Sequence, residues 1–249
     1  LGYPSSEGDP NFQGFDQFYG YNCQRVAHNY YPTHLWDNQT KESLTGNDGK
    51  TAQTYAPELI HQKALSFLEE NKEAPFFMFY PAVIPHAELV APQEYMVKYR
   101  DKYLPEKEYD RKKEGYSVGG YNYQAESHAA FAAMINILDD QVGEVLDKVH
   151  QLGIDENTLI IFTSDNGPHL EGGADPDYFD SNGPLRGYKR DLYEGGIRVP
   201  MIAYWPSKIQ PNSTTDHISA FWDFFSTAVE IAGIEKDMTS IDGISFLPT

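Results

Sequence analysis

The spacing of apolar residues predicts three helices. Residues 124–152 place apolar side chains at steps of three or four along one face, and Gly153 follows as a residue typical of a helix C-terminus. A second helix of about four turns is predicted from residue 54, with Pro57 in its first turn, and a third over residues 219–232. The first fifty residues keep no period for long, so loops are expected there.

Three short apolar runs predict strands at residues 75–80, 158–163 and 199–205. They alternate with the helices along the chain, an order that favours an α/β fold with a mostly parallel sheet covered by helices. Ligand sites of such sheets lie beyond the carboxyl ends of the strands. We therefore expect the chemistry directly after Tyr80 and Thr163.

Composition narrows the functional classes. The chain has 249 residues, a net charge of −18 and an isoelectric point near 4.7, so it repels a phosphate backbone and is not expected to bind nucleic acid. No apolar run approaches the roughly 18 residues that a membrane span needs. Cys23 is the only cysteine, which excludes an internal disulfide and a multi-cysteine zinc site.

An acidic and an amide side chain stand together after the second predicted strand. Asp165 and Asn166 lie in the run Ser-Asp-Asn-Gly-Pro, and their oxygens suit a hard cation such as Ca²⁺ or Mg²⁺. The same run is a common turn sequence, so an ordinary Asx turn is the alternative. Two oxygen donors do not complete a calcium shell of roughly six to eight ligands, so further ligands are needed from elsewhere.

A histidine and a group of cations are the other candidates. His86 follows the first predicted strand, where an imidazole can donate a proton or hold an anion; a structural role is the alternative. Four positive charges fall between residues 186 and 198 of this acidic chain: Arg186, Lys189, Arg190 and Arg198. They form either a solvated patch paired with nearby acids or a pocket for an anionic substrate, in which the lysine acts as a compact point charge.

Taken in chain order, three segments resemble the type I sulfatase (arylsulfatase-like) family of the alkaline phosphatase superfamily. They are Pro85-His86, the run 164–167, and the run Gly-Tyr-Lys-Arg-Asp-Leu-Tyr-Glu-Gly-Gly-Ile-Arg-Val-Pro at 187–200. Further similarity in residues 14–21 and 242–249 extends the resemblance over nearly the whole chain. The resemblance implies an α/β fold, an alkaline-phosphatase-like α/β/α sandwich with a mostly parallel central sheet.

That family hydrolyses sulfate monoesters with a calcium ion and a formylglycine made from cysteine or serine. The resemblance implies that Asp165 and Asn166 are metal ligands for Ca²⁺. It also implies that Lys189 contacts the sulfate and its bridging oxygen, and that His86 binds sulfate and helps to protonate the departing alcohol. The implied substrate is a sulfated carbohydrate or an aryl sulfate.

The sequence departs from the family at the nucleophile. No Cys/Ser-x-Pro-x-Arg motif occurs in it, since Cys23 is followed by Gln-Arg-Val. The N-terminal aspartate pair that the family uses as further metal ligands is also absent. We therefore expect one partial catalytic domain over residues 1–249, truncated at both ends and inactive by itself, without its nucleophile segment and a C-terminal subdomain.

Two alternatives stay open. One is a phosphodiesterase or phosphonate monoester hydrolase of the same superfamily, because tetrahedral anions need similar binding groups. The other is a non-catalytic protein that binds anions or carbohydrates. Family habit favours a periplasmic or secreted location. Tyr188, His28 and His169 lie close to motif residues and receive no role from the sequence, which also leaves the particular ester and the oligomeric state open.

Overall fold

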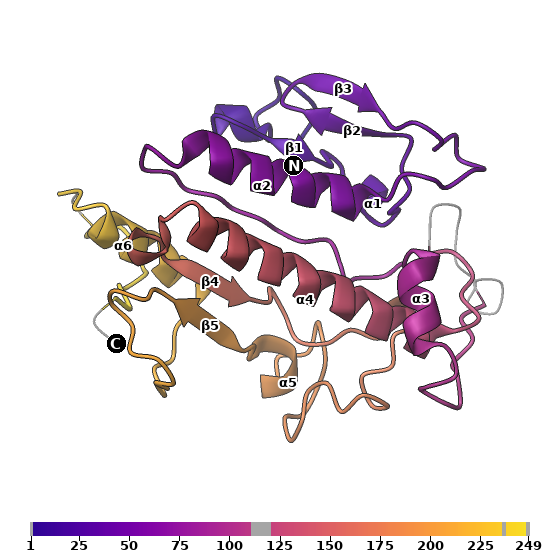
Figure 1. The fold of residues 1–249 in the computed structure, drawn as a ribbon. Coiled ribbons are helices and arrows are strands. Elements are labelled where there is room, and N and C mark those ends of the chain that lie inside the picture. Colours follow the sequence, from indigo (N-terminus) through magenta and orange to yellow (C-terminus); the bar gives the residue numbers. More distant parts are fainter. Residues whose placement is uncertain (1, 111–120, 236–237, 248–249) are drawn as a thin grey trace. The chain divides into compact units, whose positions relative to one another are not determined.

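Contacts between residues divide the chain into two units, residues 1–204 and residues 205–249. The computed structural model describes residues 2–110, 121–235 and 238–247. Within these described residues, the larger unit holds helices together with a three-stranded and a two-stranded sheet (Figure 1).

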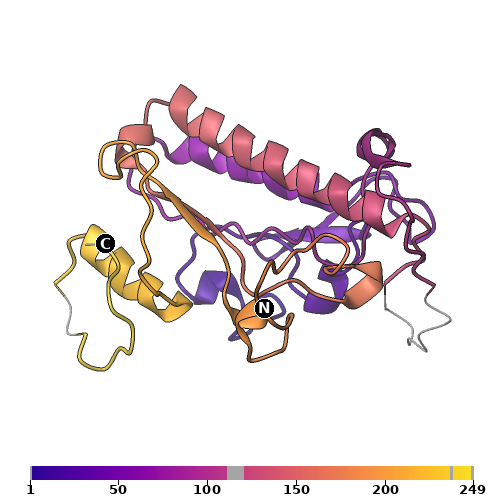
Figure 2. The same ribbon diagram turned by 90° about the horizontal axis from the view of Figure 1, so that it is seen from below.

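Two long helices lie side by side in the larger unit (Figures 1 and 2). They are α2 (Ala56–Asn71) and α4 (Ser127–Gln151), and both confirm helices predicted from apolar spacing. Leu68 of α2 packs against Val145 and Val149 of α4. Burying each such side chain stabilises the fold by about 1.5–3 kcal/mol.

The end of α4 follows the sequence signal at Gly153. This residue has a φ of +69°, a conformation that glycine adopts at little cost. Its N–H donates to the His150 carbonyl (3.0 Å), and the Ile154 N–H donates to the Val149 carbonyl (3.2 Å), the two hydrogen bonds of a Schellman motif. Ile154 packs in the same apolar cluster as Val149, which fixes the direction in which the chain leaves the helix.

The N-terminal segment forms a small antiparallel sheet where loops were expected. Its strands are β1 (Tyr19–Gly20), β2 (His34–Asp37) and β3 (Thr40–Ser43). Asn38, with a φ of +53°, lies in the tight turn between β2 and β3. The sequence does not reveal the sheet because β3 is polar and exposed along its whole length, so no apolar alternation marks it.

The run at residues 75–80 was expected to be a strand, and no strand is assigned there among the described residues. The segment is extended, with Phe76 and Met78 packed into the cluster of α2 and α4. Phe77 and Phe79 on the opposite face are 55% and 65% exposed. The segment therefore has the alternating burial of a strand but lacks the ladder of hydrogen bonds that defines one.

Two predicted strands pair with each other. β4 (Ile160–Thr163) and β5 (Met201–Tyr204) run antiparallel, as do all the strands of both described sheets. This differs from the mostly parallel sheet expected from the order of elements. A parallel pair needs a long crossover, usually a helix, whereas the chain between β4 and β5 holds only η3 (Glu171–Gly173) and α5 (Glu194–Ile197) among its assigned elements.

The remaining elements of the larger unit are short: η1 (Pro10–Phe12), α1 (Gln24–Ala27), α3 (Gln93–Tyr99) and η2 (Asp155–Asn157). α3 packs on α4, with Met96 and Met134 in one core cluster. Among the helices of the described residues, none combines the length and the apolar character that crossing a membrane requires.

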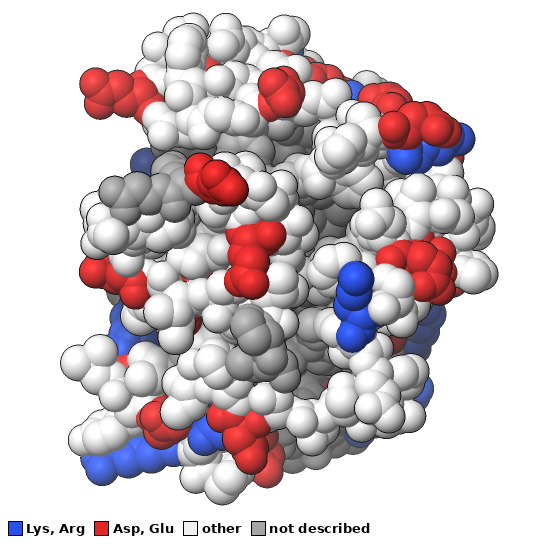
Figure 3. Space-filling model, turned by 90° about the vertical axis from the view of Figure 1, so that its left-hand side faces the viewer, with Lys and Arg blue, Asp and Glu red and all other residues white. Residues whose placement is uncertain are grey.

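Charged side chains are dispersed on the face shown in Figure 3. Acidic groups are spread over it, and basic groups stand in small separate patches. The face offers no broad basic surface, in keeping with the net charge of −18.

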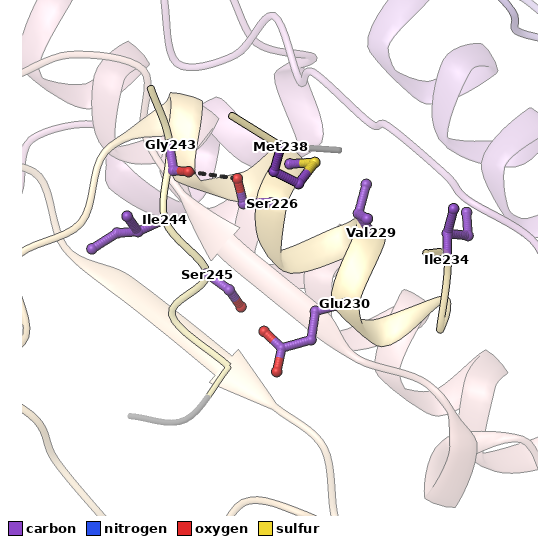
Figure 4. Close-up of a pocket in the computed structure, with 8 residues that line it drawn as sticks. All are labelled: Ser226, Val229, Glu230, Ile234, Met238, Gly243, Ile244 and Ser245. Carbon is purple, nitrogen blue, oxygen red and sulfur yellow. Dashed lines mark hydrogen bonds between the residues drawn. The ribbon is translucent and has the colours of Figure 1, made fainter. Parts of the chain in front are cut away.

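The smaller unit is built on α6 (Phe221–Ile231), which confirms the third predicted helix. Ser226 donates a hydrogen bond to the Gly243 carbonyl (2.7 Å), and Asp223 accepts one from the Ile244 N–H (3.0 Å), so the last residues lie along the helix (Figure 4). A hollow of about 410 Å³ lies beside this contact. Its eight lining residues include one carboxylate, Glu230, and neither an imidazole nor a cation, so they offer no positive charge to an anion.

Candidate functional site

Two loops leave the same end of the β4–β5 pair. Residues 164–168 follow β4, and residues 186–198 lead toward β5. Thr163 pairs with Met201 in the sheet, and antiparallel pairing sets the end of one strand beside the start of the other. The start of the first loop and the end of the second therefore lie next to each other.

Backbone hydrogen bonds join these loops. The Gly167 N–H donates to the Gly196 carbonyl (2.9 Å), and the Lys189 N–H donates to the Pro168 carbonyl (2.8 Å). The approach is so close that a Cβ at Gly167 would lie 1.8 Å from the Gly195 carbonyl oxygen. Only glycine fits there. The glycines of the two motifs thus have a structural task, which is to hold the second loop and its lysine against the first.

The side chain of Lys189 reaches His86. Its Nζ lies 3.0 Å from His86 Nε2, although the two residues are 103 positions apart in the chain. Both residues are partly buried. The structure thus brings together the two residues that the resemblance implies for the sulfate.

The imidazole of His86 is held by its other nitrogen. Nδ1 lies 2.7 Å from the Ala87 carbonyl oxygen, so it carries a hydrogen and donates. This leaves the Nε2 lone pair of the neutral ring to accept from the Lys189 ammonium group. The buried Tyr30 hydroxyl donates to the His86 carbonyl oxygen and anchors the backbone at the same point.

Two further imidazoles stack on the His86 ring. The ring centroids of His28 and His86 are 5.1 Å apart with planes at 7°, and those of His169 and His86 are 5.0 Å apart with planes at 22°. Tyr121 packs its ring edgewise against His28, at 5.4 Å. The sequence assigned no role to His28 or His169, because nothing in their spacing indicates that the rings meet.

Burial keeps the two outer imidazoles neutral near neutral pH. It lowers the pKa of His28, with a further lowering from His86 and Lys189. It also lowers the pKa of His169 to about 4, again with help from His86. Beyond His169, Glu171 lies 2.9 Å from its Nδ1.

Lys189 differs from the three arginines near it. Arg190 forms an ion pair with Glu171, Arg198 lies 3.5 Å from Glu194, and Arg186 lies over the ring of Tyr193 at 3.8 Å. Among the described residues, no carboxylate lies within ion-pair distance of the Lys189 ammonium group. The sequence left open a solvated patch paired with acids or a pocket for an anion. Arg190 and Arg198 fit the first alternative because they pair with acids, and Lys189 remains available to an anion.

Asp165 and Asn166 begin the loop that carries Gly167. The Asp165 side chain is exposed, and Asn166 is partly buried. Their oxygens fit a hard cation in kind, but the described part of the chain contains no group of three or more His, Cys, Asp or Glu residues that could hold a metal ion. Their role as metal ligands stays a prediction.

Comparison with known proteins decides the family. The family profile described as Sulfatase matches residues 2–234. The chain belongs to the sulfatase family. The resemblance that His86, the 164–167 run and the 187–200 run carried is thereby confirmed.

Curated relatives of this sulfatase chain include enzymes from animals and bacteria. It is 30% identical over 203 residues to N-acetylgalactosamine-6-sulfatase of Mus musculus, covering 80% of the chain and 34% of the relative. It is 27% identical over 252 residues to the uncharacterized sulfatase YdeN of Escherichia coli (strain K12), covering 99% and 38%. The chain thus spans about a third of the length of the curated relatives it matches.

Solved structures share the fold of this chain. Ps i-CgsB in complex with k-i-k-neocarrahexaose aligns with a TM-score of 0.74 and 24% identity, over 98% of this chain and 51% of that one. BT4656 in complex with its substrate D-Glucosamine-2-N, 6-O-disulfate aligns with a TM-score of 0.69 and 21% identity, over 95% and 58%. The alkaline-phosphatase-like α/β fold expected from the sequence is confirmed by these neighbours.

Proposed function

We propose that the full-length protein hydrolyses sulfate monoesters, with His86 and Lys189 at the sulfate. The observation that carries the proposal is the 3.0 Å contact between Lys189 Nζ and His86 Nε2, in a chain of the sulfatase family. An ammonium group without a carboxylate partner among the described residues and an imidazole nitrogen face the same point. Such a pair suits a small anion and its leaving oxygen.

The two side chains have separate tasks in this reaction. Negative charge builds on the leaving oxygen as its bond to sulfur breaks, and an ammonium group aimed at that oxygen lowers the energy of the transition state. In its protonated form His86 carries a hydrogen on Nε2 as well as on Nδ1, and it gives the Nε2 proton to the departing alkoxide. The Nδ1–H stays on the Ala87 carbonyl throughout, so the ring does not have to turn.

The attacking group is not assigned within these residues. The formylglycine expected from the resemblance requires a Cys/Ser-x-Pro-x-Arg motif, and the 249 residues contain none. His86 and Lys189 act on the leaving-group side of the sulfate, where their tasks do not depend on which group attacks.

A calcium ion at Asp165 and Asn166 forms part of the proposal. Both side chains offer oxygen donors, and the exposed Asp165 carboxylate has no hydrogen bond or ion pair with another described residue. Two donors are too few for calcium, so we assign the remaining ligands to groups outside the described residues. Bound calcium would neutralise charge on the sulfate oxygens.

A sulfated sugar is the substrate class that we propose. The relatives include N-acetylgalactosamine-6-sulfatase, and the solved structure of BT4656 holds D-Glucosamine-2-N, 6-O-disulfate. Polar side chains suited to sugar hydroxyls lie on the chain next to the site: Tyr188 hydrogen-bonds to Asp177, and Arg190 pairs with Glu171.

Turnover by the full-length protein tests the proposal. We expect release of sulfate from 4-nitrophenyl sulfate and from a 6-O-sulfated hexosamine. His86→Ala should lose activity strongly on the hexosamine sulfate, whose alkoxide needs the proton, and much less on 4-nitrophenyl sulfate. His150→Ala is the matched control, because that histidine is exposed and pairs with Asp155 at the end of α4. Faster turnover of nitrophenyl phosphate esters would instead identify a phosphodiesterase or phosphonate hydrolase, and binding of sulfated sugar without turnover would identify a non-catalytic protein.

A further inference from the structure

Three imidazoles form one stack in the larger unit, with His86 in the middle. The ring centroids of His28 and His86 are 5.1 Å apart, and those of His86 and His169 are 5.0 Å apart. The interplanar angles of 7° and 22° show that each outer ring lies nearly parallel to His86, as in offset stacking. The two ring nitrogens of His86 make separate polar contacts. Nδ1 contacts the Ala87 carbonyl oxygen, and Nε2 contacts Lys189 Nζ.

The three rings come from separate segments that the fold brings together. His28 directly follows α1, His86 follows the extended run, and His169 precedes η3. Gly172 makes the last approach possible, because it has a φ of +62° and a Cβ there would lie 2.7 Å from the Ala87 Cβ. The Tyr121 ring makes edge contacts with both His28 and His86.

We propose that His28 and His169 are positioning residues, whose rings hold the His86 imidazole so that Nε2 stays directed at the leaving oxygen beside Lys189. This inference rests on the proposed function, since it concerns the proton that His86 gives to the leaving group. A hydrogen bond at Nδ1 alone leaves the ring free to tilt about that bond. Two rings stacked against the imidazole oppose that tilt, and a misplacement of about 1 Å at a reacting group costs about 10²-fold in rate.

The charges around His86 suit this task. Lys189 faces Nε2, His28 and His169 face the ring, Tyr121 presents an edge, and Glu171 lies beyond His169. Burial lowers the pKa of both outer histidines, which disfavours a further positive charge beside His86. A neutral ring attracts a cation lying over its face, whereas a second imidazolium would repel it.

The test compares two leaving groups in the full-length enzyme. An alkyl alcohol of a sulfated sugar needs the proton from His86, whereas 4-nitrophenolate leaves without one. For His28→Leu and His169→Leu we expect kcat on the sugar sulfate to fall about 10- to 100-fold, with KM changed by less than about threefold. On 4-nitrophenyl sulfate the same variants should lose less than about threefold in kcat.

Phenylalanine is the matched replacement, because it restores a flat ring without a titrating group. We expect His28→Phe and His169→Phe to exceed the leucine variants by about tenfold in kcat on the sugar sulfate. Equal losses on both substrates, no loss in the leucine variants, or phenylalanine no better than leucine would each overturn the proposal. His150→Ala, distant in the sequence and exposed, controls for loss of a histidine.

A measurement independent of turnover covers the remaining outcomes. If a leucine variant does not fold, the ¹⁵N chemical shifts of His86 in the phenylalanine variants test the positioning instead. The Nδ1–H tautomer inferred from the Ala87 carbonyl contact should persist in them, and a mixture of tautomers would contradict positioning by the stacked rings. If the wild type cleaves no sulfate ester, the proposed function fails, and the same ¹⁵N shifts still test the stack separately.

Discussion

Lys189 Nζ and His86 Nε2 meet at 3.0 Å, although 103 positions separate the residues in the chain. The contact depends on two loops joined through Gly167 and Gly196 at the end of the β4–β5 pair. Because Arg190 and Arg198 pair with carboxylates, the charge of Lys189 is the one that the fold directs to an imidazole. Its removal should therefore change the chemistry rather than the fold.

Lys189→Ala in the full-length enzyme should lower kcat more than it raises KM, because the ammonium group contributes most as charge builds on the leaving oxygen. Loss of one such charge-stabilising group typically costs about 10²- to 10³-fold in kcat. Steady-state kinetics on a sulfate ester measure both constants. Arg198→Ala, in the same loop but paired with Glu194, is the control, and an unchanged kcat in Lys189→Ala would remove the lysine from this role.

Gly167→Ala should destabilise the protein by at least about 2 kcal/mol, because the new Cβ would lie 1.8 Å from the Gly195 carbonyl oxygen and drive the two loops apart. Gly143→Ala in α4 is the matched control, since open space surrounds that position. It should stabilise the helix by about 0.5–1 kcal/mol. Urea denaturation of both variants gives their free energies of unfolding. Equal changes in the two variants would show that the loops can move apart without loss of stability.

The 249-residue chain should bind calcium weakly, with a midpoint above about 10 µM, because Asp165 and Asn166 are two donors of a shell that needs roughly six to eight. Isothermal titration calorimetry measures the midpoint. Asp165→Ala should abolish the remaining heat, and Asp139→Ala, which removes an exposed carboxylate from α4, should not. A submicromolar midpoint would require an oxygen shell fuller than the one assigned here.

The free energy of unfolding should fall as the pH drops from about 6.5 to about 4, in part because of His169. Burial lowers its pKa from 6.5 to about 4, so in this interval the unfolded chain binds a proton that the folded chain does not. The histidine accounts for up to about 3 kcal/mol of that loss. Urea denaturation at pH 7 and pH 4.5 should show a smaller fall for His169→Phe than for the wild type, and equal falls would contradict the assignment.

Local patterns predict the helices well because a helix is formed by neighbours in sequence. The apolar stripe of residues 124–152 and the stop at Gly153 reappear as α4 and its Schellman motif. The run at residues 75–80 was expected to be a strand and is not assigned as one. Its apolar pattern could not decide this, because a strand is defined by a partner elsewhere in the chain. For the same reason, the antiparallel direction of β4 and β5 depends on the path between them, which apolar runs do not encode.

The candidate site shows the same division. His86 and Lys189 were found because each lies in a recognisable motif, and the contact between them is a property of the fold. His28 and His169 lie close to motif residues, but only the meeting of three distant segments shows that they stack on His86. The sequence offers a single hint, the glycine at 172 that admits the approach.

The hydrogen bond from Gly167 to Gly196 closes residues 168–195 into a loop. Within it, Asn182 donates to the Gly187 carbonyl and Phe179 packs on Phe131, whereas the exposed Ser181 and Pro184 can vary while the lysine keeps its place. An engineer testing the proposed preference for sulfated sugars would do best to diversify these two positions and leave the glycines untouched.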